Sequence, residues 1–364
     1  MRVVLSGGGT GGHIYPCLAV AQALRQEAGA NAPELLYIGV RGRMDEQIVG
    51  RAGLPFVAIN AGPLRVASLT GQIRGLANLA RGTLEAWRLL GRFRPDAVFA
   101  TGGYASVPVG IAARARRAPL LVYLPDVRPG WAVRLLSRLA TRIATTTERS
   151  RGELPKEKTV ADGYPVREPF WSADREAARR ALSLPQDEKV LLVTGASQGA
   201  RSLNMAIANN LDELLPECHV LHLTGRGDEQ AMLARRDELP PALRERYHVR
   251  GYLEEMADAM AAADLAVMRA GASTLGELPA AGLPAVLVPG VYEGGYTQHA
   301  NASYLEEQGA AVIVDGSQLG RLTGVVRELL ADDARRHAMA EAARRLAQPE
   351  AARTLARMVL EAAA

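Results

Sequence analysis

The chain has 364 residues, a formal net charge of +4 and 48% hydrophobic residues, a length and composition typical of two globular domains, each with its own core. Only Cys17 and Cys218 are present, which excludes a disulfide framework. Met1 leads directly into an apolar run, and no stretch of about 18 apolar residues follows. We therefore expect a protein without a signal peptide or a membrane span.

Short apolar runs predict strands that alternate with helical stretches in both halves. In the first half they cover residues 3–5, 35–38, 97–100, 120–124 and 142–145. In the second half they cover residues 190–194, 219–223, 247–249, 265–268, 285–288 and 311–314. This alternation predicts an α/β fold with parallel sheets covered by helices on both faces. Charges and prolines indicate a linker at 151–171, and residues 332–364 read as helix without a strand.

Glycine-rich turns follow three of these runs and precede helical patterns. Their sequences are GGGTGGH at 7–13, TGGYAS at 101–106 and GASQGA at 195–200. A strand, a glycine turn and a helix N-terminus form an anion site, although each turn alone is explained equally well as a tight connection. The spacing Gly7-x-Gly9-x-x-Gly12 also leaves open an NADP-dependent oxidoreductase, because Arg41 and Arg43 follow the second run.

His13 stands where the first turn becomes a helix. The positive end of a helix favours the neutral imidazole, which a general base requires. A polar residue without a chemical role would fit the same place. The other histidines have no metal-ligand spacing, and the chain has no Asp-x-Asp motif, so no metal is expected.

The most specific stretch is RAGASTLGEL at 269–278, followed by AAGLPAVLVP at 280–289. It resembles the donor-binding signature of the GT-B glycosyltransferases. Together with the first two turns, PVR at 165–167 and QHANA at 298–302, it resembles the family-28 enzymes that convert lipid I to lipid II in peptidoglycan biosynthesis. These enzymes move N-acetylglucosamine from UDP-N-acetylglucosamine to undecaprenyl-diphosphate-linked muramyl-pentapeptide.

The resemblance covers nearly the whole chain and implies a GT-B fold, in which two Rossmann-like domains face each other across a cleft. Residues 1–160 would form the acceptor and membrane domain, and residues 161–340 the UDP-sugar domain. Residues 341–364 would form a helix that packs back toward the first domain.

The resemblance also implies binding residues for both substrates. For the donor these are Thr10, Gly11, Gly12, Asp126, Arg167, Ser197, Leu253, Ala272, Ser273, Thr274, Leu275, Gly276, Glu277 and Gln298. For the acceptor diphosphate they are Gly9, Gly102, Gly103, Tyr104 and Ser106. Ser197 and Arg167 would bind the donor diphosphate, Leu253 the uracil, Glu277 the ribose and Gln298 the sugar. Thr274 and Glu277 also have the spacing of a capping box, in which Thr274 would cap its own helix.

Two departures from the family pattern affect the donor contacts. The family's His-Glu-Gln-Asn reads YLPD at 123–126, and its Gly-Asn-Pro-Val-Arg reads GYPVR at 163–167. Asp126 therefore adds a negative charge near a diphosphate, for which Arg128 is a candidate partner. These changes leave open another GT-B transferase with a different lipid acceptor.

An apolar stripe and a basic stripe run side by side through residues 73–88. The apolar stripe includes Ile73, Leu76 and Trp87, and the basic stripe consists of Arg74, Arg81 and Arg88. Such a helix is typical of an anionic membrane surface, although a core helix with solvated arginines has the same pattern. A lipid-linked acceptor favours peripheral contact with the cytoplasmic face of the inner membrane.

The resemblance implies inverting displacement at the anomeric carbon without a required metal ion. His13 is the candidate base, and helix N-termini with Arg167 would stabilise the leaving UDP. A carboxylate or the acceptor's own diphosphate could share this work with His13. A UDP-sugar epimerase and a non-catalytic nucleotide-sugar scaffold at the membrane stay as alternative functions. The expected partners are the donor, lipid I, an anionic membrane and other cell-wall synthesis proteins, with no nucleic acid.

Overall fold

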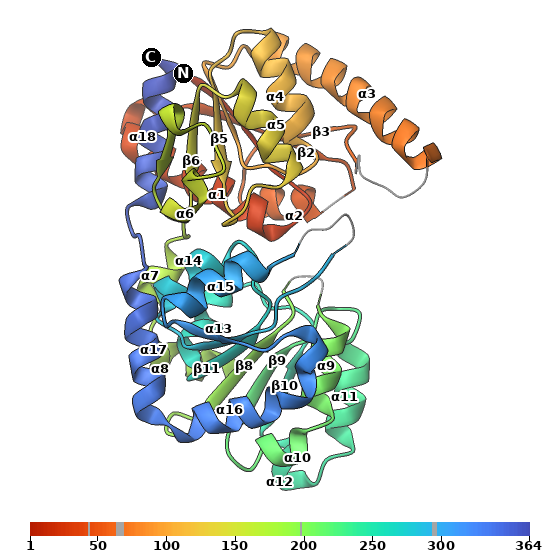
Figure 1. Ribbon diagram of the computed structural model, residues 1–364, viewed down its shortest axis with the longest axis vertical. Coiled ribbons are helices and arrows are strands. Elements are labelled where there is room, and N and C mark those ends of the chain that lie inside the picture. The colour runs from red at the N-terminus through yellow and green to blue at the C-terminus, as the bar shows by residue number, and fades with distance from the viewer. Residues whose placement is uncertain (43, 63–68, 197–198, 293–296) are drawn as a thin grey trace. The chain divides into compact units, whose positions relative to one another are not determined.

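The computed structural model describes residues 1–42, 44–62, 69–196, 199–292 and 297–364. The chain divides into two compact units (Figure 1). Unit 1 comprises Met1–Arg167 and Gln348–Ala364, and unit 2 comprises Glu168–Ala347. The chain therefore passes from unit 1 to unit 2 between residues 167 and 168 and returns to unit 1 between residues 347 and 348. From the sequence, these boundaries were expected at 160/161 and 340/341.

Unit 1 is built on a parallel seven-stranded sheet with the order β3-β2-β1-β4-β5-β6-β7. The strands are β1 (Arg2–Ser6), β2 (Glu34–Val40), β3 (Phe56–Ile59), β4 (Ala97–Ala100), β5 (Leu120–Leu124), β6 (Arg142–Thr145) and β7 (Thr159–Ala161). Along β1, Val3 and Leu5 enter one core and Val4 enters the other. Since successive side chains of a strand face opposite sides, a sheet buried on both faces needs such continuous apolar runs.

Helices cover both faces of this sheet. They are α1 (Gly11–Ala28), α2 (Met44–Arg51), α3 (Leu69–Phe93), α4 (Ser106–Ala115), α5 (Trp131–Leu139), α6 (Glu148–Arg151) and α18 (Ala351–Ala363), with short 3₁₀ helices at Gly29–Asn31 and Lys156–Lys158. α1 and α18 contribute to one core, and α3, α4 and α5 contribute to the other.

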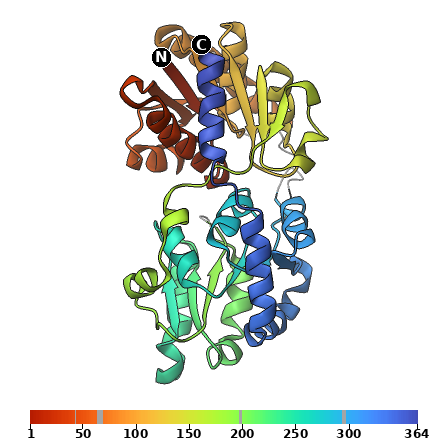
Figure 2. The ribbon, with the colours of Figure 1, turned by 90° about the vertical axis from the view of Figure 1, so that its left-hand side faces the viewer.

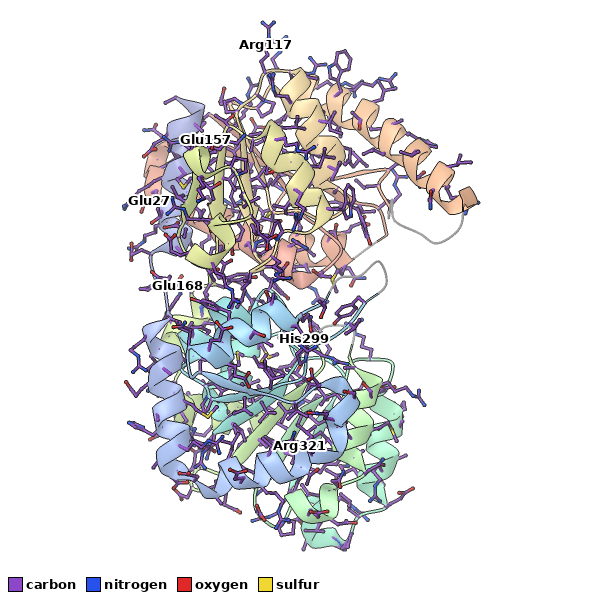
Figure 3. The ribbon with its side chains drawn as sticks, viewed as in Figure 1. Glu27, Arg117, Glu157, Glu168, His299 and Arg321 are labelled. Atoms are coloured by element: carbon purple, nitrogen blue, oxygen red, sulfur yellow. The ribbon has the colours of Figure 1, made fainter. Side chains whose placement is uncertain are left out.

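The last helix, α18, completes the core of unit 1 although it is separated from the rest of that unit by all of unit 2. Figure 2 shows α18 lying over the sheet of unit 1. Leu355 and Val359 are fully buried there, and α18 packs against α1. Arg357 Nε lies 2.7 Å from Glu27 Oε2 near the end of α1, and Figure 3 labels Glu27.

Unit 2 contains a parallel six-stranded sheet with the order β10-β9-β8-β11-β12-β13. The strands are β8 (Val190–Thr194), β9 (His219–Leu223), β10 (Tyr247–Arg250), β11 (Leu265–Met268), β12 (Ala285–Leu287) and β13 (Ala311–Ile313). The helices are α7 (Pro169–Ser172), α8 (Arg175–Leu182), α9 (Arg201–Ala208), α10 (Leu211–Leu214), α11 (Glu229–Asp237), α12 (Pro241–Arg244), α13 (Met256–Ala262), α14 (Thr274–Ala281), α15 (His299–Glu307), α16 (Leu322–Ala331) and α17 (Asp333–Arg345), with a 3₁₀ helix at Gly316–Arg321.

The fold class expected from the sequence, α/β with two Rossmann-like parallel sheets, is confirmed. Two strands were missed, β3 and β7, and both lie at sheet edges. β7 falls inside the stretch expected to be a linker, where it pairs with β6. The helical stretch at the end of the chain is interrupted at 346–350, between α17 and α18. Within the described ranges, no helix is long and apolar enough to cross a membrane.

Candidate functional site

Each sheet has a point where the order of its strands changes direction. This point lies between β1 and β4 in unit 1 and between β8 and β11 in unit 2. In open parallel α/β sheets, ligands bind beyond the carboxyl ends of the strands at such a point. The glycine-rich turns predicted from the sequence follow β1, β4 and β8, and the 269–278 signature follows β11.

His13 and Thr101 connect the two loops at the switch point of unit 1. His13 Nδ1 lies 2.8 Å from the carbonyl oxygen of Thr101, and Thr101 Oγ1 donates to the carbonyl of His13 at 2.6 Å. Because a carbonyl only accepts hydrogen bonds, Nδ1 carries a proton, and in the neutral form of the ring Nε2 is then the free acceptor. His13 is half-buried. This tautomer fits a general base that accepts a proton at Nε2.

Glycine is required where these two loops meet. Gly103 has a φ of +81°, and a Cβ there would lie 2.2 Å from the carbonyl oxygen of Gly8. Gly102 has a φ of +96°, and a Cβ there would lie 3.3 Å from the imidazole of His13. Both positions have a left-handed backbone that favours glycine. At Gly103 a side chain would also clash with the Gly8 backbone, and at Gly102 it would crowd the ring of His13.

Two of the residues implied for the acceptor diphosphate make hydrogen bonds within the fold. The N–H of Gly9 donates to Asp45 at 3.4 Å, and the same buried carboxylate accepts from the N–H of Val40 at 3.2 Å. The hydroxyl of Ser106, which is fully buried, lies 2.6 Å from the Gly102 carbonyl. Gly9 and Ser106 thus support the loops, and Asp45 is a supporting residue that the sequence analysis missed. Tyr104 is half-buried beside Gly9.

Arg167 lies in unit 1, beside the first turn of α1. Its Cζ is 4.2 Å from the centroid of the Tyr15 ring. Gly11 and Gly12 belong to the same turn, and Tyr164 Oη donates to the carbonyl of Gly12 at 3.4 Å. The structure therefore brings the PVR motif to the helix that carries His13. Thr10 precedes this helix and is exposed.

The two departures from the family pattern lie in contact with each other. The rings of Tyr123 and Tyr164 pack edge to face with centroids 6.4 Å apart, and Tyr123 Oη donates to the carbonyl of Gly163 at 3.0 Å. Burial raises the pKa of Tyr123 well above its usual range, so the phenol stays protonated. Tyr123 and Tyr164 therefore contact each other and hold the segment that leads to Arg167.

Asp126 is buried in the loop after β5, with 7% of its surface exposed. From the sequence, Arg128 was the candidate partner of this carboxylate. The ion pair that the structure gives Arg128 is with Glu153, at 3.6 Å.

In unit 2, the implied donor residues 272–277 form the turn from β11 into α14. Thr274 Oγ1 donates to the carbonyl of Arg269 at 3.1 Å, and the residue before the helix is Ser273, whose side chain makes no capping hydrogen bond. The capping role considered for Thr274 is therefore wrong. Glu277 is 7% exposed in the first turn of α14, and Ala272, Leu275 and Gly276 are also buried.

Further hydrogen bonds fix the loops after β11 and β12. The N–H of Gly290 donates to Gln298 Oε1 at 2.9 Å, which orients the amide that was predicted to contact the sugar. Asn301 Nδ2 donates to the carbonyl of Ala270 at 3.1 Å. The guanidinium of Arg269 donates to the carbonyl of Val288 at 3.1 Å. Asn301 and Arg269 lie within the sequence motifs, but neither was predicted to have a role.

The other predicted residues are less informative. Leu253 is half-buried in the loop after β10. Ser197 lies outside the described residues. Among the residues that the structure describes, no group of three or more His, Cys, Asp or Glu side chains is placed to hold a metal ion.

Comparison with known proteins identifies the family. Residues 3–145 match the model of the glycosyltransferase family 28 N-terminal domain, and residues 190–355 match that of its C-terminal domain. A relative from Roseiflexus sp. (strain RS-1) is 42% identical over 89% of this chain and 85% of its own length. It is named UDP-N-acetylglucosamine–N-acetylmuramyl-(pentapeptide) pyrophosphoryl-undecaprenol N-acetylglucosamine transferase.

Solved structures agree with this result. The crystal structure of Acinetobacter baumannii MurG matches with a TM-score of 0.75 at 26% identity, over 99% of both chains. UDP-GlcNAc 2-epimerase from Neisseria meningitidis, bound to UDP-GlcNAc, matches with a TM-score of 0.71 over 99% of this chain and 100% of its own. At 15% identity, the epimerase shares the fold alone. By its sequence matches over most of its length, the chain belongs to glycosyltransferase family 28.

Proposed function

We propose that the protein transfers N-acetylglucosamine from UDP-N-acetylglucosamine to the 4-hydroxyl of undecaprenyl-diphosphate-linked N-acetylmuramyl-pentapeptide, which converts lipid I to lipid II in peptidoglycan biosynthesis. The observation that carries this proposal is the hydrogen bond from His13 Nδ1 to the Thr101 carbonyl, which orients the ring beside two glycine loops and leaves Nε2 as its candidate acceptor atom. The relative that is 42% identical carries the name of this reaction. Family membership excludes the NADP-dependent oxidoreductase that the first glycine turn left open.

In the proposed reaction, the acceptor hydroxyl attacks the anomeric carbon of the donor. His13 Nε2 takes the hydroxyl proton as the new carbon–oxygen bond forms and the bond to UDP breaks, with inversion. We assign the donor to the carboxyl ends of β10, β11 and β12, where Glu277 and Gln298 are positioned. We assign the acceptor to the loops after β1 and β4.

Arg167 and the N–H groups at the start of α14 would balance the charge that develops on UDP. We therefore propose that the reaction requires no metal ion. Transfer should persist at full rate when a chelator such as EDTA is added. A loss of activity that added Mg²⁺ restores would contradict this part of the proposal.

We further propose that α3 binds the anionic cytoplasmic face of the inner membrane. Its apolar stripe is on the surface, with Ile73 69% and Leu76 62% exposed, so it is not the core face of the helix. That core face carries Ala86 and Leu90. The arginines Arg74, Arg81 and Arg88 are exposed along the same helix. Figure 1 shows α3 as a long helix beside α4.

The test is transfer of radiolabelled N-acetylglucosamine from its UDP donor to lipid I. We would compare wild type with His13→Ala and with His337→Ala, an exposed histidine on α17 that serves as the matched control. We expect transfer by wild type and by the control, and loss of transfer by His13→Ala with UDP binding retained. Full activity of His13→Ala would place the base elsewhere.

The alternative functions give different results in the same assay. An epimerase would convert the donor without an acceptor, and a nucleotide-sugar scaffold would bind the donor without turnover. No transfer by a folded wild type that binds UDP-N-acetylglucosamine would overturn the acceptor assignment.

A further inference from the structure

Tyr15 has no part in the reaction described above, yet its aromatic ring contacts a residue that does. Tyr15 lies near the start of α1, two residues after His13, and is half-buried. The guanidinium carbon of Arg167 sits over the face of the ring, 4.2 Å from its centroid. This distance is well inside the range of about 6 Å in which a cation is attracted by an aromatic face.

The ring also lies close to the backbone of its own helix. Gly11 is four residues before Tyr15 on α1, and residues with this spacing lie on the same face of a helix. A Cβ at Gly11 would lie 3.0 Å from Tyr15 Cε2 and 3.3 Å from Cδ2. Because Gly11 has no side chain, the Tyr15 ring has enough space to occupy this position.

Buried contacts also fix the backbone segment that precedes Arg167. Val166 and Tyr164 are buried, with 7% and 3% of their surfaces exposed. Tyr164 packs on the ring of Tyr123 and donates to the carbonyl of Gly12. The backbone before Arg167 is thereby fixed, and the contact with Tyr15 restricts the remaining freedom of the long arginine side chain.

The stacked geometry suits an arginine that binds phosphate. The five N–H donors of a guanidinium lie in its plane, whereas an aromatic ring occupies its face. A guanidinium that rests on a ring can therefore direct paired N–H groups at the oxygens of a diphosphate while it keeps the contact.

We propose that Tyr15 is a positioning residue for the donor diphosphate, which acts by holding the guanidinium of Arg167 in its phosphate-binding orientation. This inference rests on the proposed function, in which Arg167 binds the diphosphate of UDP-N-acetylglucosamine.

The experiment is a double-mutant cycle with the full-length protein. The variants are Tyr15→Leu, Tyr15→Phe, Arg167→Ala and the double variant Tyr15→Leu/Arg167→Ala. The readouts are KM for the donor and kcat at saturating lipid I, together with Kd for UDP by calorimetry. Tyr15→Met, which replaces the ring with an unbranched chain, repeats the test if Tyr15→Leu lowers thermal stability.

We expect Tyr15→Leu to raise the donor KM and the UDP Kd by about 2- to 30-fold, the effect of one cation–π contact, with kcat nearly unchanged. Tyr15→Phe keeps the ring and should behave like wild type. In the Arg167→Ala background, Tyr15→Leu should not change the donor KM or the UDP Kd further, because Tyr15 acts on the donor only through the Arg167 guanidinium.

An equal effect of Tyr15→Leu with and without Arg167 would overturn the proposal, as would an unchanged donor KM and UDP Kd. A loss of kcat alone would also contradict it and would indicate a role in supporting His13. These results are distinct from a failure of the proposed function. The UDP-binding cycle reports the coupling between Tyr15 and Arg167 even if wild type does not act on lipid I.

Discussion

Gly103 lies where the loops after β1 and β4 approach each other closely. Its left-handed backbone and the nearby carbonyl of Gly8 leave no space for a Cβ. The hydrogen bonds between His13 and Thr101 depend on the same approach of the two loops. The orientation of the candidate base therefore depends on glycines at which these two loops meet.

We predict that Gly103→Ala lowers transfer at least tenfold and also destabilises unit 1. Gly53→Ala is the matched control, because Gly53 has a φ of +65° and a Cβ there would have no atom within 4 Å. Strain alone costs about 1–2 kcal/mol at either position, so the difference between the variants reports the clash with Gly8. The measurements are thermal unfolding and initial transfer rate. Equal losses in the two variants would contradict the prediction.

The sequence predicted single residues of the site better than their partners. His13 was found because a histidine directly follows a glycine turn. Its partner Thr101 is 88 residues away, and only the pairing of β1 with β4 brings the two together. Tyr15 could not be recognised, because an aromatic residue on an amphipathic helix is more often a core residue than a partner of a distant arginine.

Among the elements, the central strands of both sheets and the edge strands β10 and β13 of unit 2 were predicted, whereas the edge strands β3 and β7 of unit 1 were missed. β1 and β4 are buried on both faces and read as apolar runs. The sequence of β3, FVAI at 56–59, is a short apolar run that was overlooked in the sequence. β7 has only three residues, and its Val160 is 44% exposed, so it shows no buried run. β7 also follows a proline and charged residues, and this composition led to the prediction of a linker rather than a strand.

For α3, we predict binding to vesicles that contain anionic phospholipid. Ile73→Ser/Leu76→Ser should lower the bound fraction at every salt concentration, because it removes apolar area. Replacing Arg74, Arg81 and Arg88 by Gln should weaken binding mainly at low salt, by about fivefold per charge. Arg345→Gln, an exposed arginine at the end of α17, is the control. Co-sedimentation measures the bound fraction, and equal binding of all variants would exclude α3 as the contact.

For the docking of α18, we predict a pH-dependent stability that arises at Asp162. Burial raises the pKa of this carboxyl from 3.8 to about 7, although a hydrogen bond with Thr354 of α18 opposes the shift. Between about pH 4 and 7 the folded state thus holds a proton that the unfolded state has released, so stability falls as the pH rises through this window. Above it, the ionised carboxylate stays in a site that disfavours charge.

Asp162→Asn cannot titrate and should remove this part of the pH dependence. The difference in Tm between Asp162→Asn and wild type should therefore increase from pH 5 to pH 8. Asp237→Asn, at an exposed position at the end of α11, is the control and should show no such trend. A constant difference in Tm for Asp162→Asn across this range would show that the carboxyl does not titrate there.

At the scale of the whole molecule, the two units differ in the number of chain segments that form them. Unit 2 is one continuous segment, whereas unit 1 needs both ends of the chain. Leu355 of α18 is fully buried in the core of unit 1, and Leu329 of α16 is fully buried in the core of unit 2. One leucine-to-alanine variant in each core therefore tests whether the units unfold independently.

We predict two calorimetric transitions, each lowered by one variant only. Leu355→Ala should destabilise unit 1, and Leu329→Ala should destabilise unit 2, each by about 3–5 kcal/mol for a fully buried leucine. UDP should raise the transition that Leu329→Ala lowers, because ligand binding stabilises the unit that holds the donor. One transition that both variants lower equally would mean that the units unfold together. UDP stabilisation of the transition that Leu355→Ala lowers would instead place the principal donor contacts in unit 1, with Arg167 as the first residue to examine.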